Sequence, residues 1–183
     1  IAAWLHDFGK VTTPEYVVDK ATKLETINDR IHEIRTRFEV LKRDAWISYW
    51  QALALGGDEP SLADLRDTDL RALDEDFAFI ARCNLGSEAM AEADLQRLDK
   101  LSRITWMRTL DDRLGVSWEE NKRQARTPAP TLPVSEKLLA DKPAHLLERD
   151  ENELIPEDNP WGFKLDVPRY KFNRGELYNL SIT

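Results

Sequence analysis

The sequence predicts an all-α fold, in which long helices form an antiparallel bundle or a coiled-coil-like insertion, followed by an extended C-terminal arm. Of its 183 residues, 33 % are charged and 7 are glycine, which is typical of exposed amphipathic helices rather than of a β-sandwich or barrel. Apolar residues recur at alternating intervals of three and four between Leu24 and Ala45. This spacing predicts one continuous helix that covers most of Leu24 to Leu53 and ends at the glycine pair 56–57.

Three further helices are predicted after this long helix. Capping boxes, in which a serine is followed three positions later by an acidic residue, start a helix over 61–84 and a short helix over 117–126. A helix between them is expected over 95–114, because leucines recur at helical spacing as far as the Leu-Gly pair at its end. The long helix and the helices over 61–84 and 95–114 are therefore expected to pack antiparallel to one another.

The rest of the chain is expected to be less regular. Pro128, Pro130 and Pro133 predict a stiff extended connector. A short helix is a candidate over 135–140, and alternation of apolar and polar residues over 163–167 predicts a brief strand or an extended arm.

Several single residues are expected to be structural. Trp46, Trp50 and Trp106 lie at helical spacing and are expected to fill the core or, alternatively, to form a ligand cage. Cys83 has no partner for a CxxC motif, and we expect it to be a small buried residue.

A short motif near the start of the sequence carries metal and phosphate chemistry. The segment Ala-Ala-Trp-Leu-His-Asp-Phe-Gly-Lys, residues 2–10, places His6 and Asp7 side by side and Lys10 one helical turn later. An imidazole next to a carboxylate is suited to hold a divalent metal ion, and a lysine supplies positive charge for phosphate oxygens. The motif therefore predicts a phosphohydrolase, with His6 and Asp7 as metal ligands and Asp7 and Lys10 as catalytic residues.

The motif and its surroundings resemble a known family. Residues 3–11, followed by Pro14-Glu15, Val17-Val18, Lys20 and Lys23-Leu24, resemble the HD-GYP family of metal-dependent phosphodiesterases. The resemblance implies an all-helical catalytic domain, bound divalent metal ions such as iron or manganese, and a cyclic dinucleotide, cyclic di-GMP, as the substrate in bacterial signal transduction.

The end of the sequence carries a second part of this resemblance. Residues 170–182 resemble the segment by which some HD-GYP proteins re-enter the catalytic core after a long insertion. The expected division is therefore the start of a catalytic domain over 1–24, a helical insertion over 25–133, and a connector with a returning arm over 134–183.

The sequence also departs from the family pattern. The expected metal-binding histidine after Leu24 is replaced by Arg35, and the nearest histidine is His32, which is read as a surface residue or, alternatively, as a displaced ligand. His145 is read as structural. The other family histidines and the Gly-Tyr-Pro signature would lie beyond Thr183, so we expect a piece of a larger enzyme that binds no metal tightly and is inactive in isolation.

Composition limits the partners and the compartment. A net charge of −8 argues against a nucleic-acid polymer, because phosphate backbones need a basic surface. No apolar run approaches the roughly 20 residues that cross a bilayer, so no membrane contact is expected, and the single cysteine suits the cytoplasm. A long helix with an apolar stripe predicts a homo-oligomer. The alternative function is therefore a helical dimerisation or signal-coupling module without catalysis of its own.

Overall fold

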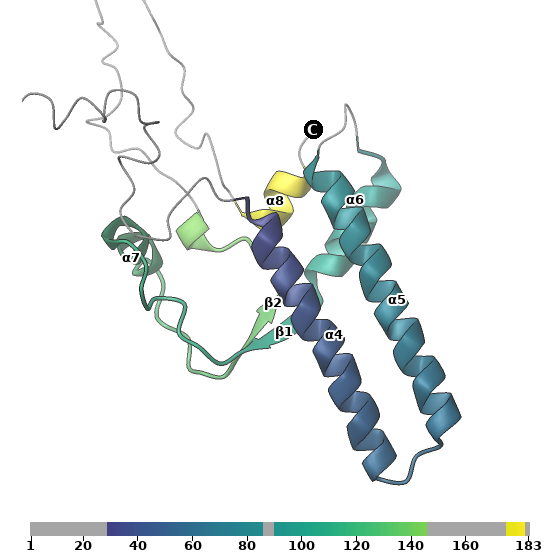
Figure 1. The fold of residues 1–183 in the computed structure, drawn as a ribbon. Helices are drawn as coiled ribbons and strands as arrows, with labels where there is room; N and C mark the ends of the chain where they lie inside the picture. The colour runs from purple at the N-terminus through teal and green to yellow at the C-terminus, as the bar shows by residue number, and fades with distance from the viewer. Residues whose placement is uncertain (1–28, 86–89, 146–174, 182–183) are drawn as a thin grey trace, which may run out of the picture.

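The structure, a computed structural model, describes residues 29–85, 90–145 and 175–181. In chain order the elements are α4 (Ile31–Ala54), α5 (Glu59–Asn84), α6 (Glu92–Ser102), β1 (Thr105–Arg108), α7 (Trp118–Gln124), β2 (Val134–Lys137), the 3-10 helix η1 (Pro143–His145) and α8 (Glu176–Ser181) (Figure 1). Most of the described residues are helical, which confirms the predicted all-α class.

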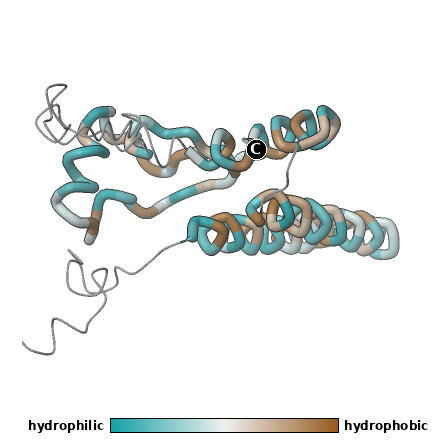
Figure 2. The backbone as a smooth tube through the Cα atoms, turned by 90° about the horizontal axis from the view of Figure 1, so that it is seen from above, coloured by the Kyte–Doolittle hydropathy of each residue, from teal (hydrophilic) through white to brown (hydrophobic). Residues whose placement is uncertain are grey.

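The two long helices α4 and α5 form an antiparallel hairpin. Seen from above, the hairpin makes one layer and the other described elements lie in a second layer beside it (Figure 2). The turn between the helices uses Gly56 at φ +86°, a conformation that L side chains rarely adopt. Asp58 then caps α5, since its side chain accepts a hydrogen bond from the backbone N–H of Ser61 at 3.1 Å. The cap is therefore Asp58, and the predicted cap at Ser61 was wrong by one turn.

Helix α4 follows the predicted apolar spacing. Ile34 and Phe38 are buried against α5, with Ile31 and Leu41 partly buried beside them. The helix begins at Ile31, where the Asp29 side chain accepts a hydrogen bond from the backbone N–H of Ile31 at 3.0 Å. It is unbroken to Ala54, which confirms the described part of the predicted helix; residues 24–28 lie outside the described residues.

The hydrophobic core lies where the N-terminal half of α4 and the C-terminal half of α5 meet α6, the segment directly after β2, and α8. Ile80, Leu98 and Leu138 are completely buried, and burial of each side chain contributes about 1.5–3 kcal/mol. The complete set of buried apolar residues in this cluster is Ile34, Phe38, Phe79, Ile80, Leu98, Leu101, Leu138, Leu139 and Leu180. The core thus joins segments from both ends of the described chain.

The segment after α6 differs from the prediction. Helix α6 ends at Ser102, and residues 105–108 form β1, which pairs antiparallel with β2 so that Trp106 lies opposite Glu136. Alternate burial along β1 and a β-branched and aromatic start favour a strand here. The predicted helix over 95–114 was therefore wrong beyond Ser102, and the candidate helix over 135–140 was wrong because its first residues belong to β2.

The predicted burial of the tryptophans was also wrong in part. Trp46 is 40 % exposed and Trp50 is 57 % exposed, while Trp106 is half-buried. The reason is that the half of the α4–α5 hairpin next to its turn extends beyond the core, and none of the other described helices covers it (Figure 1). Cys83 is partly buried against the core.

The C-terminal segment returns to the core as helix α8. Gly175 precedes it at φ +137°, where a Cβ atom would lie 2.6 Å from the Asp141 Cα atom, so glycine is required by space as well as by conformation. Asp141 accepts a hydrogen bond from the backbone N–H of Tyr178 at 3.2 Å. The arm expected over 163–167 lies outside the described residues.

Candidate functional site

The motif residues His6, Asp7 and Lys10 lie outside the described residues. Within the described ranges, no group of three or more His, Cys, Asp or Glu side chains is arranged to hold a metal ion. His32 is exposed on α4, and its Nδ1 atom lies 2.9 Å from the Arg35 guanidinium, in keeping with a surface residue. The described part of the chain therefore presents a different candidate site.

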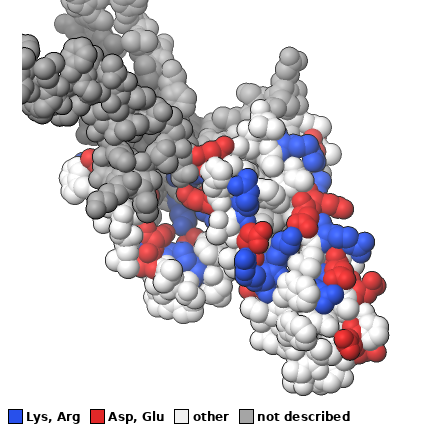
Figure 3. All heavy atoms as spheres, viewed as in Figure 1, with Lys and Arg blue, Asp and Glu red and all other residues white. Residues whose placement is uncertain are grey.

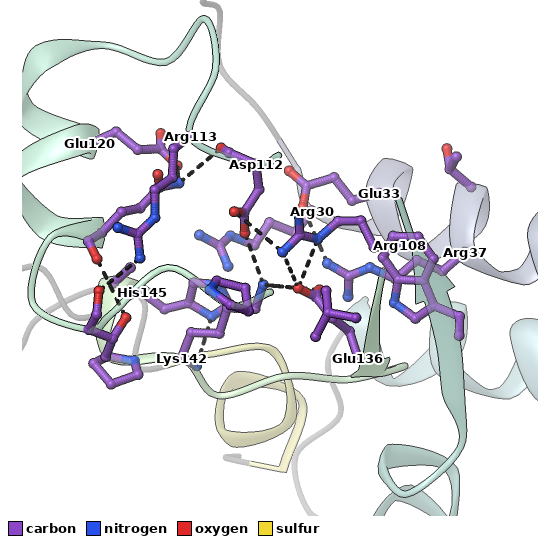
Figure 4. Close-up of a pocket in the computed structure, with 18 of the residues that line it drawn as sticks. Arg30, Glu33, Arg37, Arg108, Asp112, Arg113, Glu120, Glu136, Lys142 and His145 are labelled. Carbon is purple, nitrogen blue, oxygen red and sulfur yellow. Dashed lines mark hydrogen bonds and ion pairs between the residues drawn. The ribbon is translucent and has the colours of Figure 1, made fainter. Parts of the chain in front are cut away.

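This site is a cavity of about 640 Å³, a size typical of pockets for small molecules. It is enclosed by the first turns of α4, the β1–β2 ribbon, the segment around α7, and η1 (Figure 4). Ionisable side chains dominate its lining: Arg30, Glu33, Arg37, Arg108, Asp112, Arg113, Glu120, Glu136, Lys142 and His145. Apolar walls come from Val40, Trp106, Pro128, Pro130, Val134 and Pro143.

An ionic network forms one side of the cavity. Glu136 on β2 accepts hydrogen bonds from Arg108 Nε at 2.9 Å and from Lys142 Nζ at 3.0 Å. Asp112 lies 3.4 Å from each of the same two cations. Burial raises the pKa of Glu136, but the hydrogen bonds from Arg108 and Lys142 outweigh it and hold that pKa below its ordinary value. Ion pairs and hydrogen bonds thus link these four side chains into one network.

Arg37 connects the cavity to the returning C-terminal segment. Its Nη1 atom lies 2.5 Å from Glu176 Oε2 and donates to the Leu138 carbonyl at 2.9 Å. The backbone N–H of Ala140 donates to the same carboxylate oxygen at 3.0 Å. Arg37 also lies 3.6 Å from Glu33, one helical turn earlier. The guanidinium is therefore fixed by contacts on both sides.

His145 is held in its neutral form. Burial lowers its pKa from 6.5 to about 4, and the positive charge of Arg30 adds to this effect. The backbone N–H of Lys142 lies 3.4 Å from His145 Nδ1, which accepts the hydrogen bond in the neutral ring. His145 therefore presents an uncharged imidazole to the cavity at pH 7.

Two arginines of the lining are incompletely paired. Among the described residues, Arg30 makes one long ion pair, 3.9 Å to Glu176, and Arg113 donates from its guanidinium to the Thr127 carbonyl at 2.8 Å. Three buried polar atoms of the lining, Trp106 Nε1, Arg108 Nη2 and Gln124 Oε1, have no hydrogen-bond partner within the described residues. The cavity thus holds spare donors and one spare acceptor.

Sequence reasoning did not identify this cavity. Its charged residues are spread from Arg30 to His145 without a local motif. Trp106 was expected in the core, with a ligand cage as the alternative, and His145 was given no functional role. The connector with three prolines does line the cavity through Pro128 and Pro130, but its composition predicts only an extended chain.

The free end of the α4–α5 hairpin carries a second notable surface. Trp46, Tyr49 and Trp50 form an aromatic cluster, with centroids of Tyr49 and Trp50 4.9 Å apart, and the Arg66 guanidinium lies 4.2 Å from the Trp46 ring centroid. Lys, Arg, Asp and Glu are mixed along the hairpin, whereas other residue types dominate its free end (Figure 3). Among the described helices none is long and apolar enough to span a bilayer.

Comparisons with known proteins found no match for this chain. No protein-family model matches it, and neither the curated proteins nor the solved structures contain a significant match.

Proposed function

We propose that this chain is part of a metal-dependent phosphodiesterase of the HD-GYP type that hydrolyses cyclic di-GMP. The observation that carries the proposal is the motif of residues 2–10, with an adjacent His6 and Asp7 and with Lys10 one turn later. The path of the C-terminal segment supports it, because α8 docks beside the first turns of α4 through the Arg37–Glu176 ion pair. A returning arm needs a docking place of this kind after a long insertion.

The residues of the motif would divide the chemistry between them. Bound iron or manganese would supply an activated water and charge stabilisation at the phosphoryl group. His6 and Asp7 would hold the metal, Asp7 would orient the attacking water, and Lys10 would stabilise negative charge on the phosphoryl oxygens. The donor set of imidazole and carboxylate fits these metals, but two protein ligands hold a metal weakly. The isolated chain is therefore expected to be inactive.

The test uses the natural polypeptide that carries this sequence with its flanking residues. Hydrolysis of cyclic di-GMP would be measured with added manganese or ferrous iron, beside metal content after purification. His6→Ala and Asp7→Ala should abolish turnover and lower metal content, and Lys10→Ala should lower turnover with metal retained. His32→Ala is the matched control, because His32 is exposed and contacts Arg35. Turnover that survives His6→Ala would refute the proposal. So would turnover that is lost in His32→Ala but retained in the three motif variants.

A second candidate function, an interaction module, is favoured by the hairpin. Its free end exposes Ile47 (52 %) and Trp50 (57 %), and tryptophan and arginine are common anchors of protein interfaces. A homo-oligomer formed through α4 is the proposed assembly, and a role in coupling a sensor to a catalytic domain is compatible with both candidates. The single cysteine supports a cytoplasmic location as part of this proposal.

A further inference from the structure

We propose that the cavity beside α4 binds a phosphate monoester of a sugar or nucleoside, with Arg30 and Arg113 holding the phosphate and Gln124 accepting a hydrogen bond from the ligand. This inference rests on the described residues alone and does not depend on the proposed phosphodiesterase activity.

The first argument is the charge that remains after internal pairing. Each carboxylate of the lining has a cationic partner: Asp112 and Glu136 pair with Arg108 and Lys142, Glu33 with Arg37, and Glu120 with Arg123. Arg30 has a single ion pair at 3.9 Å, and no carboxylate lies within ion-pair distance of Arg113 in the described structure. Two guanidinium groups with unused donors therefore reach the cavity from different elements, one before α4 and one between β1 and α7 (Figure 4).

The second argument is the match between these donors and a phosphate group. Guanidinium groups bind phosphate oxygens through paired, charge-assisted hydrogen bonds. A phosphate monoester carries about −1.5 to −2 charges at pH 7 and three acceptor oxygens, which is enough charge and enough acceptor sites for two guanidinium groups. A single carboxylate has fewer acceptor sites and half the charge.

The third argument concerns two of the unpartnered buried atoms, Trp106 Nε1 and Gln124 Oε1. A buried polar atom without a hydrogen bond costs stability, so most such atoms in proteins have a partner. Trp106 Nε1 requires an acceptor and Gln124 Oε1 requires a donor, whereas the Gln124 Nε2 group already donates to the Asp112 carbonyl at 3.3 Å. A ligand that satisfies both atoms carries a hydroxyl or amino group as well as its anionic oxygens.

The apolar part of the lining indicates the rest of the ligand. Trp106, Val40 and the proline side chains offer flat carbon surface, and about 640 Å³ exceeds what inorganic phosphate fills. A sugar ring with its hydroxyl groups, or a nucleoside, fits both the volume and the mixed polarity.

The test is equilibrium binding to the full chain by calorimetry, supported by thermal shift, with AMP and ribose 5-phosphate as probes. Adenosine, inorganic phosphate and malate are the comparison ligands. At least one of the two phosphate esters should bind, with adenosine and inorganic phosphate at least about tenfold weaker, because each lacks one half of the recognised chemistry. Equal binding of malate would overturn the assignment to phosphate esters, and absence of binding by both esters would overturn the site.

Variants locate the binding within the cavity. Arg113→Gln and Arg30→Gln should each lower the affinity for the phosphate ester about tenfold, as expected for loss of one charged hydrogen bond. Trp106→Phe should lower it about two- to tenfold, as expected for loss of one neutral hydrogen bond. Arg103→Gln on α6 is the matched control, because Arg103 is exposed and pairs with Asp99 outside the cavity. Circular dichroism checks that the variants fold. Unchanged affinity in Arg113→Gln and Arg30→Gln would refute the proposal.

Discussion

Arg37 and Glu176, 139 residues apart in the sequence, form a buried ion pair with an N–O distance of 2.5 Å. The pair joins α4 to α8, and the hydrogen bond from the Ala140 backbone to Glu176 adds the segment after β2 to the same junction. Because the Glu176 side chain is 1 % exposed, its charge depends on Arg37 for compensation. This junction fixes the start of α4, which forms one wall of the cavity.

Removal of one partner of this pair should therefore be severe. Glu176→Ala leaves the Arg37 guanidinium partly buried without its main counter-charge, and we expect the free energy of unfolding to fall by about 3–5 kcal/mol. Chemical denaturation monitored by circular dichroism measures the change. Arg43→Ala is the control, since the exposed Arg43–Glu39 pair should contribute less than about 1 kcal/mol. Equal losses in the two variants would contradict a special role for the junction.

The core makes a second prediction. Leu98 on α6 is completely buried between elements of both layers, so Leu98→Ala removes apolar contacts and leaves a cavity. The expected loss of unfolding free energy is about 2–5 kcal/mol. Leu110→Ala, at a position that is 79 % exposed, should change stability by less than about 0.5 kcal/mol in the same denaturation experiment. A small loss at Leu98 would show that α6 is not part of the cooperative core.

The neutral His145 predicts a pH dependence of stability. Its pKa is about 4 in the folded chain and 6.5 ordinarily, so between these values the unfolded state binds more protons than the folded state. Stability should therefore fall as pH decreases from about 6.5 to about 4, by at most about 3 kcal/mol.

Comparison with His145→Asn isolates this contribution. The variant keeps an acceptor near the Lys142 backbone N–H but does not titrate, so its stability should vary less across the same pH range. Glu136 also has a shifted pKa, but it is lowered from 4.5, and its contribution is lost mainly below that pH. Parallel stability curves for the two proteins between pH 4.5 and pH 6.5 would disprove the role of His145.

The helical part of the fold was predictable because its signals are local. The periodicity that buries Ile34 and Phe38 and the turn before α5 can be read from neighbouring residues. The ribbon could not be predicted in the same way, because residues 105–108 become a strand only through pairing with residues 134–137 across an intervening helix. Its stability comes from a partner that is distant in the sequence.

The candidate site shows the same limit. The motif around His6 and Asp7 can be read directly, because adjacent residues carry its chemistry. The cavity depends on which arginines remain unpaired, and pairing is decided by tertiary contacts such as Lys142 with Glu136. A count of charges along the sequence cannot distinguish Arg113 from an exposed surface arginine.

The free end of the hairpin makes the last prediction, which concerns self-association. Ile47 and Trp50 are more than half exposed on α4, and an exposed apolar patch of this kind is typical of an interaction surface. We expect light scattering to give a mass above that of the monomer, rising with concentration. Ile47→Glu should shift the particle to the monomer mass, because a dimer would have to bury the new charge on both copies. Leu110→Glu makes the same change from an apolar to an acidic side chain at an exposed position outside the hairpin, and it should leave the particle mass unchanged. A monomer at all concentrations, or an equal effect of both substitutions, would show that the hairpin does not mediate self-association.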